Sequence, residues 1–392
     1  MLTKVPRKLL FLLEIFLFAL FLYPVSNGAG QSINYLFLCL PLYQLFYVRR
    51  VAKMPHSIYI SVVVFIILYF LSFPFVLLFK SDFVFRGFVS FLIFISAFSY
   101  CLFYVDNSSL IAFKYAVIIV AFYFSINSLV NFAFVDRSDI ALVKDMIGTQ
   151  RTGFIHTLAL SILLFSSDRS FLARWKQMSL VFFIFLGLIL TFSRTPLIAI
   201  IFTFCIFSIS SMSKERIYKW VLKAGITIGV LILFVLVLKY LAYDIYLFFD
   251  DRIFQRLIMG DSQAVLLDPE TSEGTRIGIW KLIIWSIMES PFFGSGYLGT
   301  YSMDSVVNYG SAHSQYMDVL YRTGVIGFVV YMYIIYFIMK SVFSDGALFY
   351  GFVSILVYGF FHETFKESQG AFIFAIYLGL STTLHFRRSA KN

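Results

Sequence analysis

Stretches of about 20 apolar residues recur from one end of this chain to the other, and each could cross roughly 30 Å of hydrocarbon as an α-helix. Inside a bilayer the backbone must satisfy its hydrogen bonds internally, which leaves helices or closed barrels. The apolar residues run continuously instead of alternating, so a barrel is not indicated. Only 13% of the 392 residues are charged, against about 25% in soluble domains. The sequence predicts an all-α polytopic membrane protein.

The apolar stretches predict twelve membrane-spanning helices. They are expected at residues 9–23, 32–48, 57–79, 84–105, 111–134, 153–168, 178–192, 196–212, 220–242, 323–343, 347–364 and 370–386. The first resembles a signal peptide, but Glu14 interrupts its apolar centre and no small-residue cleavage motif follows, so we interpret it as a span. Glu14 is either a carboxyl group facing the interior of the helix bundle or a group that binds protons or substrate.

The connections between these spans alternate in charge. One set carries 18 basic residues, namely Lys4, Arg7, Lys8, Arg49, Arg50, Lys53, Lys114, Arg169, Arg174, Lys176, Lys214, Arg216, Lys219, Lys223, Lys340, Arg387, Arg388 and Lys391. The short connections of the other set carry seven, namely Lys80, Arg86, Arg137, Lys144, Arg151, Arg194 and Lys366. The positive-inside rule then places both termini in the cytoplasm. This bias explains the net charge of +10 without nucleic-acid binding.

One outer connection, residues 243–322, is far longer than the others and divides the chain. Nine spans precede it in residues 1–242, and three follow it in residues 323–392. A loop of this length is usually functional or disordered, and its aromatic and apolar content argues against disorder. Residues 273–299 within it show helical periodicity that ends at Pro291, with Trp280 and Trp285 suited to a membrane interface. We predict a helix in the outer leaflet, followed by the flexible turn GSGYLG.

Three arginines lie on the predicted outer side, against the general bias. Arg194 occupies a tight hairpin between two spans, Arg276 opens the interfacial helix, and Arg151 lies just outside the sixth span. Each is either a snorkelling anchor at the lipid headgroups or part of a converging set that binds phosphate oxygens in bidentate fashion.

His313 lies where the long loop re-enters the membrane, and Tyr316 follows one helical turn later. A neutral imidazole can act as a general base near neutral pH, although a histidine that merely satisfies a helix start remains the alternative. His156 and His362, also on the outer side, are second-rank candidates, whereas His56 and His385 flank cytoplasmic basic clusters.

Motifs for nucleotides and metals are absent from the sequence. There is no G-x-x-x-x-G-K-[ST] loop, and His362-Glu363 is followed by Lys366 instead of a second histidine. The three cysteines, Cys39, Cys101 and Cys205, each lie inside an apolar run without a spacing partner. We therefore expect no metal site and no cofactor, and any enzyme here would use a substrate that is already activated.

Four segments carry a resemblance to a known family. LTFSRTPLIA, GTRIGIWKLIIWSIMESPFFGSGYLGT and AHSQYMDVLYRTGVIGFVVYM look like successive landmarks of the O-antigen polymerase and O-antigen ligase superfamily. These landmarks are an S-R hairpin, an R-x3-W helix that ends in P-x-x-G-x-G, and a histidine helix that ends in G-x-x-G. QRTGFIHTLA is similar to the arginine segment before the sixth span. The resemblance covers about residues 151–331.

The resemblance implies metal-independent glycosyl transfer at the outer face of the bacterial inner membrane, from a sugar chain on undecaprenyl diphosphate. It implies that His313 deprotonates the acceptor hydroxyl and that Arg194, Arg276 and Arg151 bind the diphosphate. The family often has asparagine after the histidine, and here Ser314 stands in that place. Tyr316 and Tyr297 are candidates for stacking on sugars. Membrane lipids, a chain-length regulator and a flippase are the expected partners.

Other functions fit the sequence less well. A polysaccharide flippase or other transporter would also have about twelve spans, but transporters usually show two matching halves, and the single long loop breaks such symmetry. A non-catalytic assembly partner is a further alternative. Within the superfamily, the acidic and aromatic loop and Ser314 favour a polymerase over a ligase.

The charge bias predicts that residues 243–322 lie outside the cytoplasm while both termini lie inside. A fusion of alkaline phosphatase at Asp261 should therefore be active, and one at the C-terminal end of the chain should be inactive. A reporter at Asp261 that works only in the cytoplasm would contradict the predicted topology.

Overall fold

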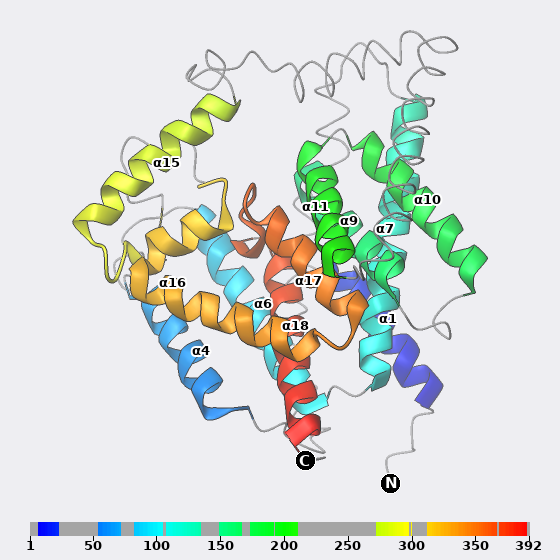
Figure 1. Cartoon of the computed structure of the whole chain (residues 1–392), viewed down its shortest axis with the longest axis horizontal. Coiled ribbons are helices and arrows are strands. Elements are labelled where there is room, and N and C mark those ends of the chain that lie inside the picture. The colour runs from blue at the N-terminus through cyan, green and yellow to red at the C-terminus, as the bar shows by residue number, and fades with distance from the viewer. Residues whose placement is uncertain are drawn as a thin grey trace. The chain divides into compact units, whose positions relative to one another are not determined.

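The computed structural model describes residues 7–22, 54–71, 82–104, 107–134, 149–166, 173–191, 193–210, 272–297, 299, 312–366 and 368–389. Within these residues the secondary structure is helical throughout (Figure 1). The helices are α1 (Arg7–Leu22), α4 (His56–Tyr69), α6 (Asp82–Tyr104), α7 (Asn107–Phe134), α9 (Thr149–Phe165), α10 (Arg174–Leu190), α11 (Arg194–Ser210), α15 (Ser272–Glu289), α16 (Gln315–Val342), α17 (Gly346–Tyr358), the 3-10 turn η6 (Thr364–Lys366) and α18 (Ser368–Ser389).

Each predicted span that falls on described residues corresponds to a helix, which confirms the all-α class for this part of the chain. The spans predicted at 32–48 and 220–242 lie outside the described residues. Two helical segments, Ser108–Val130 and Gln315–Val342, are long and apolar enough by themselves to cross a membrane. The helix predicted before Pro291 is present as α15.

Three predicted boundaries differ clearly from the structure. Helix α4 ends at Tyr69, and Phe70 is its C-cap, so the helix stops well before the end of the span predicted at 57–79. Helix α16 begins at Gln315 instead of residue 323, because Asp318 and Arg322, which made this segment look like a polar loop, pair with each other one helical turn apart. Helix α17 ends at Tyr358, and Gly359 caps it, so the span predicted at 347–364 is shorter.

The chain forms two compact units, residues Met1–Ile200 with Trp280–Asn392, and residues Ile201–Ile279. In the first unit α6 packs on α18, α9 on α17, α4 on α16, and α1 on α7, while α10 contacts both α7 and α9. Glycine allows one of these close approaches. A Cβ atom on Gly351 of α17 would lie 2.8 Å from the Tyr377 hydroxyl and 2.9 Å from Leu158 Cδ1.

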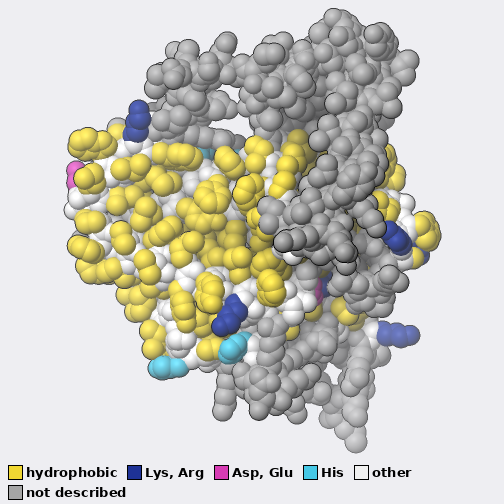
Figure 2. Space-filling view, in the orientation of Figure 1, with side chains coloured by type: hydrophobic (Ala, Val, Ile, Leu, Met, Phe, Trp, Pro, Cys, Tyr) yellow, Lys and Arg dark blue, Asp and Glu magenta, His cyan; other side chains and the backbone are white. Residues whose placement is uncertain are grey.

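The outward face of these helices is apolar. Figure 2 shows hydrophobic side chains covering most of the visible described surface. Large apolar side chains such as Trp285, Met288 and Val329 are more than half exposed. A soluble monomer rarely exposes a continuous apolar surface of this kind, so the face suits contact with lipid.

One buried carboxylate of the first unit has two partners inside the bundle. The Glu14 carboxylate, buried in α1, accepts hydrogen bonds from the Tyr100 hydroxyl at 2.8 Å and from the Ser109 hydroxyl at 2.7 Å. These bonds join α1 to α6 and α7. Of the two interpretations of Glu14, the structure supports the carboxyl group that faces the bundle interior.

Contacts between helix ends agree with the predicted sidedness. Lys114 of α7 forms an ion pair of 2.7 Å with Asp345, which caps the N-terminus of α17, and both residues belong to the predicted inner ends. A Cβ on Gly153 of α9 would lie 2.6 Å from Cγ of Pro196, which joins two predicted outer ends. Each of these two contacts joins helix ends that are predicted to lie on the same side of the membrane.

Candidate functional site

His313 has an unusual backbone conformation at the start of α16. Its φ angle is 50°, in the left-handed region, which costs a residue other than glycine about 1–3 kcal/mol and persists only where the surroundings enforce it. Ser314 follows in an extended conformation, and the helix begins at Gln315. The imidazole is partly exposed. A strained, partly exposed histidine at the end of a helix bundle fits a functional role better than a packing role.

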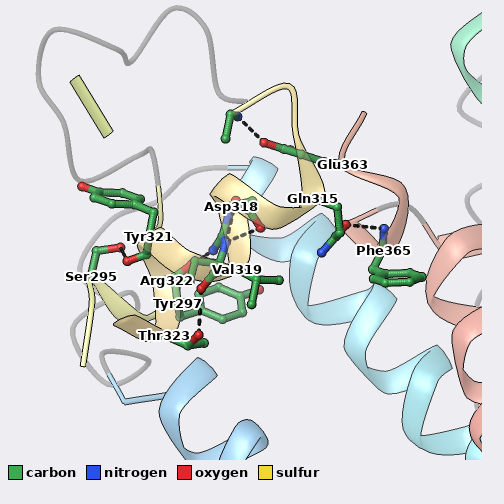
Figure 3. Close-up of polar contacts among 11 residues, drawn as sticks. Ser295, Tyr297, Gln315, Asp318, Val319, Tyr321, Arg322, Thr323, Glu363 and Phe365 are labelled. Atoms are coloured by element: carbon green, nitrogen blue, oxygen red, sulfur yellow. Dashed lines mark hydrogen bonds and ion pairs between the residues drawn. The ribbon is translucent and has the colours of Figure 1, made fainter. Parts of the chain in front are cut away.

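The residue before His313 is held through both of its backbone groups. The Ala312 N–H donates to Oε1 of Glu363 (Figure 3). The Ala312 carbonyl accepts from Nε1 of Trp280 at 2.8 Å. Ala312 is fully buried and Glu363 is 9% exposed. A buried N–H without an acceptor would be costly, so the carboxylate fixes this side of His313.

The residue two positions after His313 is held as firmly. The Gln315 N–H donates to the Gly359 carbonyl at 2.8 Å, and its side-chain oxygen accepts from the Phe365 N–H at 2.8 Å (Figure 3). The residues on both sides of His313 are thus hydrogen-bonded to the segment that joins α17 to α18. This segment, residues 359–365, is named the α17–α18 connection below.

Tyr316 and Tyr297, the candidate sugar-stacking residues, are both engaged with the protein. The Tyr316 hydroxyl donates to the Leu356 carbonyl at 2.8 Å, and its ring lies 4.4 Å from that of Phe360, centroid to centroid. The Tyr297 side chain is 2% exposed and packs against the ring of Phe70. The Tyr297 ring is therefore covered in this arrangement, whereas Tyr316 keeps a partly exposed side chain beside His313.

Two of the three candidate arginines lie on adjoining helix starts. Arg151 is in the first turn of α9, and Arg194 is the first residue of α11. The close approach of Gly153 to Pro196 brings these turns together, and a Cβ on Gly153 would also lie 3.3 Å from the hydroxyl of Tyr358, next to the α17–α18 connection. Both arginines thus lie at helix N-termini, where the free backbone N–H groups and the helix dipole favour bound anions.

The side chains of the three arginines lie outside the described residues. Arg276 falls in α15, within the unit formed by Ile201–Ile279. The structure thus brings the Arg151 and Arg194 turns to the same end of the first unit as His313. The convergence of Arg276 with them stays a prediction.

The other outer histidines have different surroundings. His156 is completely buried in α9, with its ring 6.5 Å from that of Phe124. His362 stacks on Tyr358 at 4.8 Å between ring centroids, inside the α17–α18 connection. His156 is thus a core residue here, whereas His362 belongs to the end of the bundle that carries His313.

Sequence reasoning missed Glu363 and Gln315, the residues that anchor the His313 segment. Glu363 was noted only as part of an incomplete metal motif. A carboxylate at the predicted outer end of a span, where acidic residues are uncommon, is a signal that could have singled it out. Its hydrogen-bond partner is the backbone N–H of Ala312, far away in the chain. The sequence gives no sign of this contact.

The fold and site describe a helical membrane protein whose polar site lies at the ends of its helices. Residues 179–332 match the family model described as O-antigen ligase. This match confirms, over residues 179–332, the resemblance to the O-antigen polymerase and ligase superfamily seen in the sequence, and members of that superfamily are glycosyltransferase-like membrane enzymes. None of the curated proteins compared with the chain matches it.

The anchoring of Ala312 predicts an effect of Glu363 on catalysis. Glu363→Ala removes the acceptor of the Ala312 N–H and should slow glycosyl transfer by about 100-fold, the order expected when a catalytic group shifts by about 1 Å. Glu363→Gln keeps a carbonyl oxygen in this position and should retain most of the rate. The measurement is transfer by purified protein present at normal levels.

Glu289→Ala, which removes an exposed carboxylate at the end of α15, is the matched control and should be neutral. Equal rates for Glu363→Ala and Glu289→Ala would show that this anchor does not position His313.

Proposed function

We propose that the protein is an O-antigen polymerase. It joins oligosaccharide repeat units carried on undecaprenyl diphosphate into surface polysaccharide, at the periplasmic face of the bacterial inner membrane. Family membership supports glycosyl transfer in general. The observation that carries the proposal is the His313 segment, held in a left-handed conformation at the end of the unit where Arg151 and Arg194 begin two helices.

His313 is the general base in this proposal. Its imidazole takes the proton from the acceptor hydroxyl, and the oxygen then attacks the anomeric carbon of the donor sugar. The bond between that carbon and the diphosphate oxygen breaks, and the electron pair leaves with the undecaprenyl diphosphate. The proton stays on the imidazole until solvent removes it. General-base catalysis of this kind contributes roughly 10²–10⁴-fold.

The arginines stabilise the leaving group. The diphosphate gains negative charge as its bond to the sugar breaks, and fixed cations in a site of low dielectric stabilise that charge. Arginine suits this role because its planar fork binds two phosphate oxygens at once, which lysine cannot do. With Arg194, Arg276 and Arg151 in this role, the reaction requires no divalent metal ion and no cofactor.

A ligase is the second candidate, because the matching family model is described as an O-antigen ligase. A ligase would use the same donor, base and arginines but would transfer the polymer to lipid A core. We favour the polymerase because Ser314 replaces the asparagine often found after the histidine, and because the acidic loop 243–322 looks fitted to a particular repeat unit. A chain-length regulator and a flippase are the proposed partners.

Replacing His313 tests the proposed base. His313→Ala should lower the rate of transfer by roughly 10²–10⁴-fold, measured with purified protein and lipid-linked repeat units, while protein level stays normal. His385→Ala, which removes an exposed histidine from the last turns of α18, is the control and should have no effect. Normal transfer by His313→Ala would exclude this histidine as the base.

Deleting the gene distinguishes polymerase from ligase. A strain without a polymerase should still attach single repeat units to lipid A core, because its ligase is intact. A strain without the ligase should show bare core while lipid-linked polymer accumulates. The composition of the lipopolysaccharide on a gel, with complementation as the control, gives the answer. Bare core together with accumulated polymer would make the ligase the correct assignment.

A further inference from the structure

Asp318 and Arg322 form an ion pair one turn apart near the start of α16. Nε of Arg322 lies 2.9 Å from both carboxylate oxygens of Asp318, and both residues are 3% exposed (Figure 3). Burying an ion pair is costly unless the remaining donors also find partners. The surroundings of the guanidinium therefore indicate what this pair does.

The Arg322 guanidinium also contacts the glycine-rich turn that follows α15. Nη1 of Arg322 donates to the Tyr297 carbonyl, and a Cβ on Gly299 would collide with the guanidinium. The guanidinium carbon, Cζ, lies 5.4 Å from the centroid of the Tyr69 ring. Among the described residues, the guanidinium is therefore engaged with the protein and buried, although Arg322 lies only a few turns from His313.

The same turn also forms hydrogen bonds with the backbone of α16. In a regular helix the Tyr321 carbonyl would accept from the Val325 N–H. Gly324, with φ 64° and ψ −172°, breaks this pattern. The Val325 N–H donates instead to the Pro291 carbonyl at 2.8 Å, and the Tyr321 carbonyl accepts from the Ser295 N–H at 2.8 Å.

Glycine is required on both sides of this junction. Gly294 has φ 68°, and a Cβ on it would lie 2.6 Å from the Gly324 nitrogen. The turn from Pro291 to Gly299, named the clamp turn below, therefore touches α16 backbone to backbone. Its attachment includes the two exchanged hydrogen bonds, a bond from the Ser295 hydroxyl to the Tyr321 carbonyl at 3.2 Å, and the contacts of Arg322.

We propose that Arg322, oriented by Asp318, is a positioning residue that locks the clamp turn to the helix carrying His313. The first turns of α16 join His313 to Arg322 in one continuous segment. The lock thereby sets the distance from the proposed base to the clamp turn. This role rests on the proposed glycosyl transfer, and it assigns the arginine to geometry instead of diphosphate binding.

Arg322→Lys separates this role from simple stability. Lysine keeps a positive charge beside Asp318, but a single ammonium group cannot reproduce the planar fork that also reaches the Tyr297 carbonyl. The variant should fold to normal levels, and its rate constant for transfer should fall by about tenfold or more, the size expected for a lost charge-assisted hydrogen bond. The KM for the undecaprenyl-diphosphate-linked repeat unit should stay unchanged.

A second readout needs no substrate. Hydrogen–deuterium exchange of the full-length purified protein should show residues 291–299 exchanging about tenfold faster in Arg322→Lys, with the α17–α18 connection unchanged. The double variant Asp318→Asn/Arg322→Gln removes both charges and avoids an unpaired buried ion. It should behave like Arg322→Lys. Lys340→Gln, which removes an exposed cation from the same helix, is the control.

The outcomes are distinguishable. Unchanged exchange of residues 291–299 in both variants would overturn the lock, whatever happens to transfer. Faster exchange with a normal rate constant, or a raised KM for the donor, would overturn the positioning role. If the unmodified protein transfers no sugar, the proposed function fails, and the exchange measurement alone decides whether the lock exists.

Discussion

The backbone hydrogen bond that α16 gives up at Gly324 organises the site end of this protein. A helix in apolar surroundings cannot leave a carbonyl and an N–H unpaired. Tyr321 and Val325 therefore bond to Ser295 and Pro291 of the clamp turn, which needs partners for the same reason. The backbone groups left unpaired at the kink and those of the turn thus hydrogen-bond to each other. These two bonds attach the segment after α15 to the helix that begins beside His313.

Several polar contacts of the first unit lie near helix ends. The bodies of the helices present apolar side chains outward, as Figure 2 shows, and add little specificity. At the predicted inner end, Lys114 and Asp345 join α7 to α17. At the predicted outer end, the α17–α18 connection fixes the His313 segment through Glu363 and Gln315. A rigid bundle thus supports a precise site on irregular backbone.

The match to the O-antigen ligase family ends at residue 332. The Glu363 carboxylate that holds Ala312 and the Gly359 carbonyl that holds Gln315 both come from the chain beyond it. Arg151, in the turn next to Arg194, precedes the match. The matched residues include His313, the proposed base, whereas the α17–α18 connection beyond the match supplies bonds to the residues on either side of it.

The sequence by itself determined the helical class, the approximate positions of the described helices and the placement of His313 near a helix start, because apolar length and backbone satisfaction are local properties. Pro291 similarly marks where α15 has ended. Only the tertiary structure decided that Asp318 and Arg322 continue a helix, that Arg322 turns inward to Tyr297, and that Glu363 anchors Ala312. Each of the last two contacts joins residues far apart in the chain, and helix packing alone brings them within bonding distance.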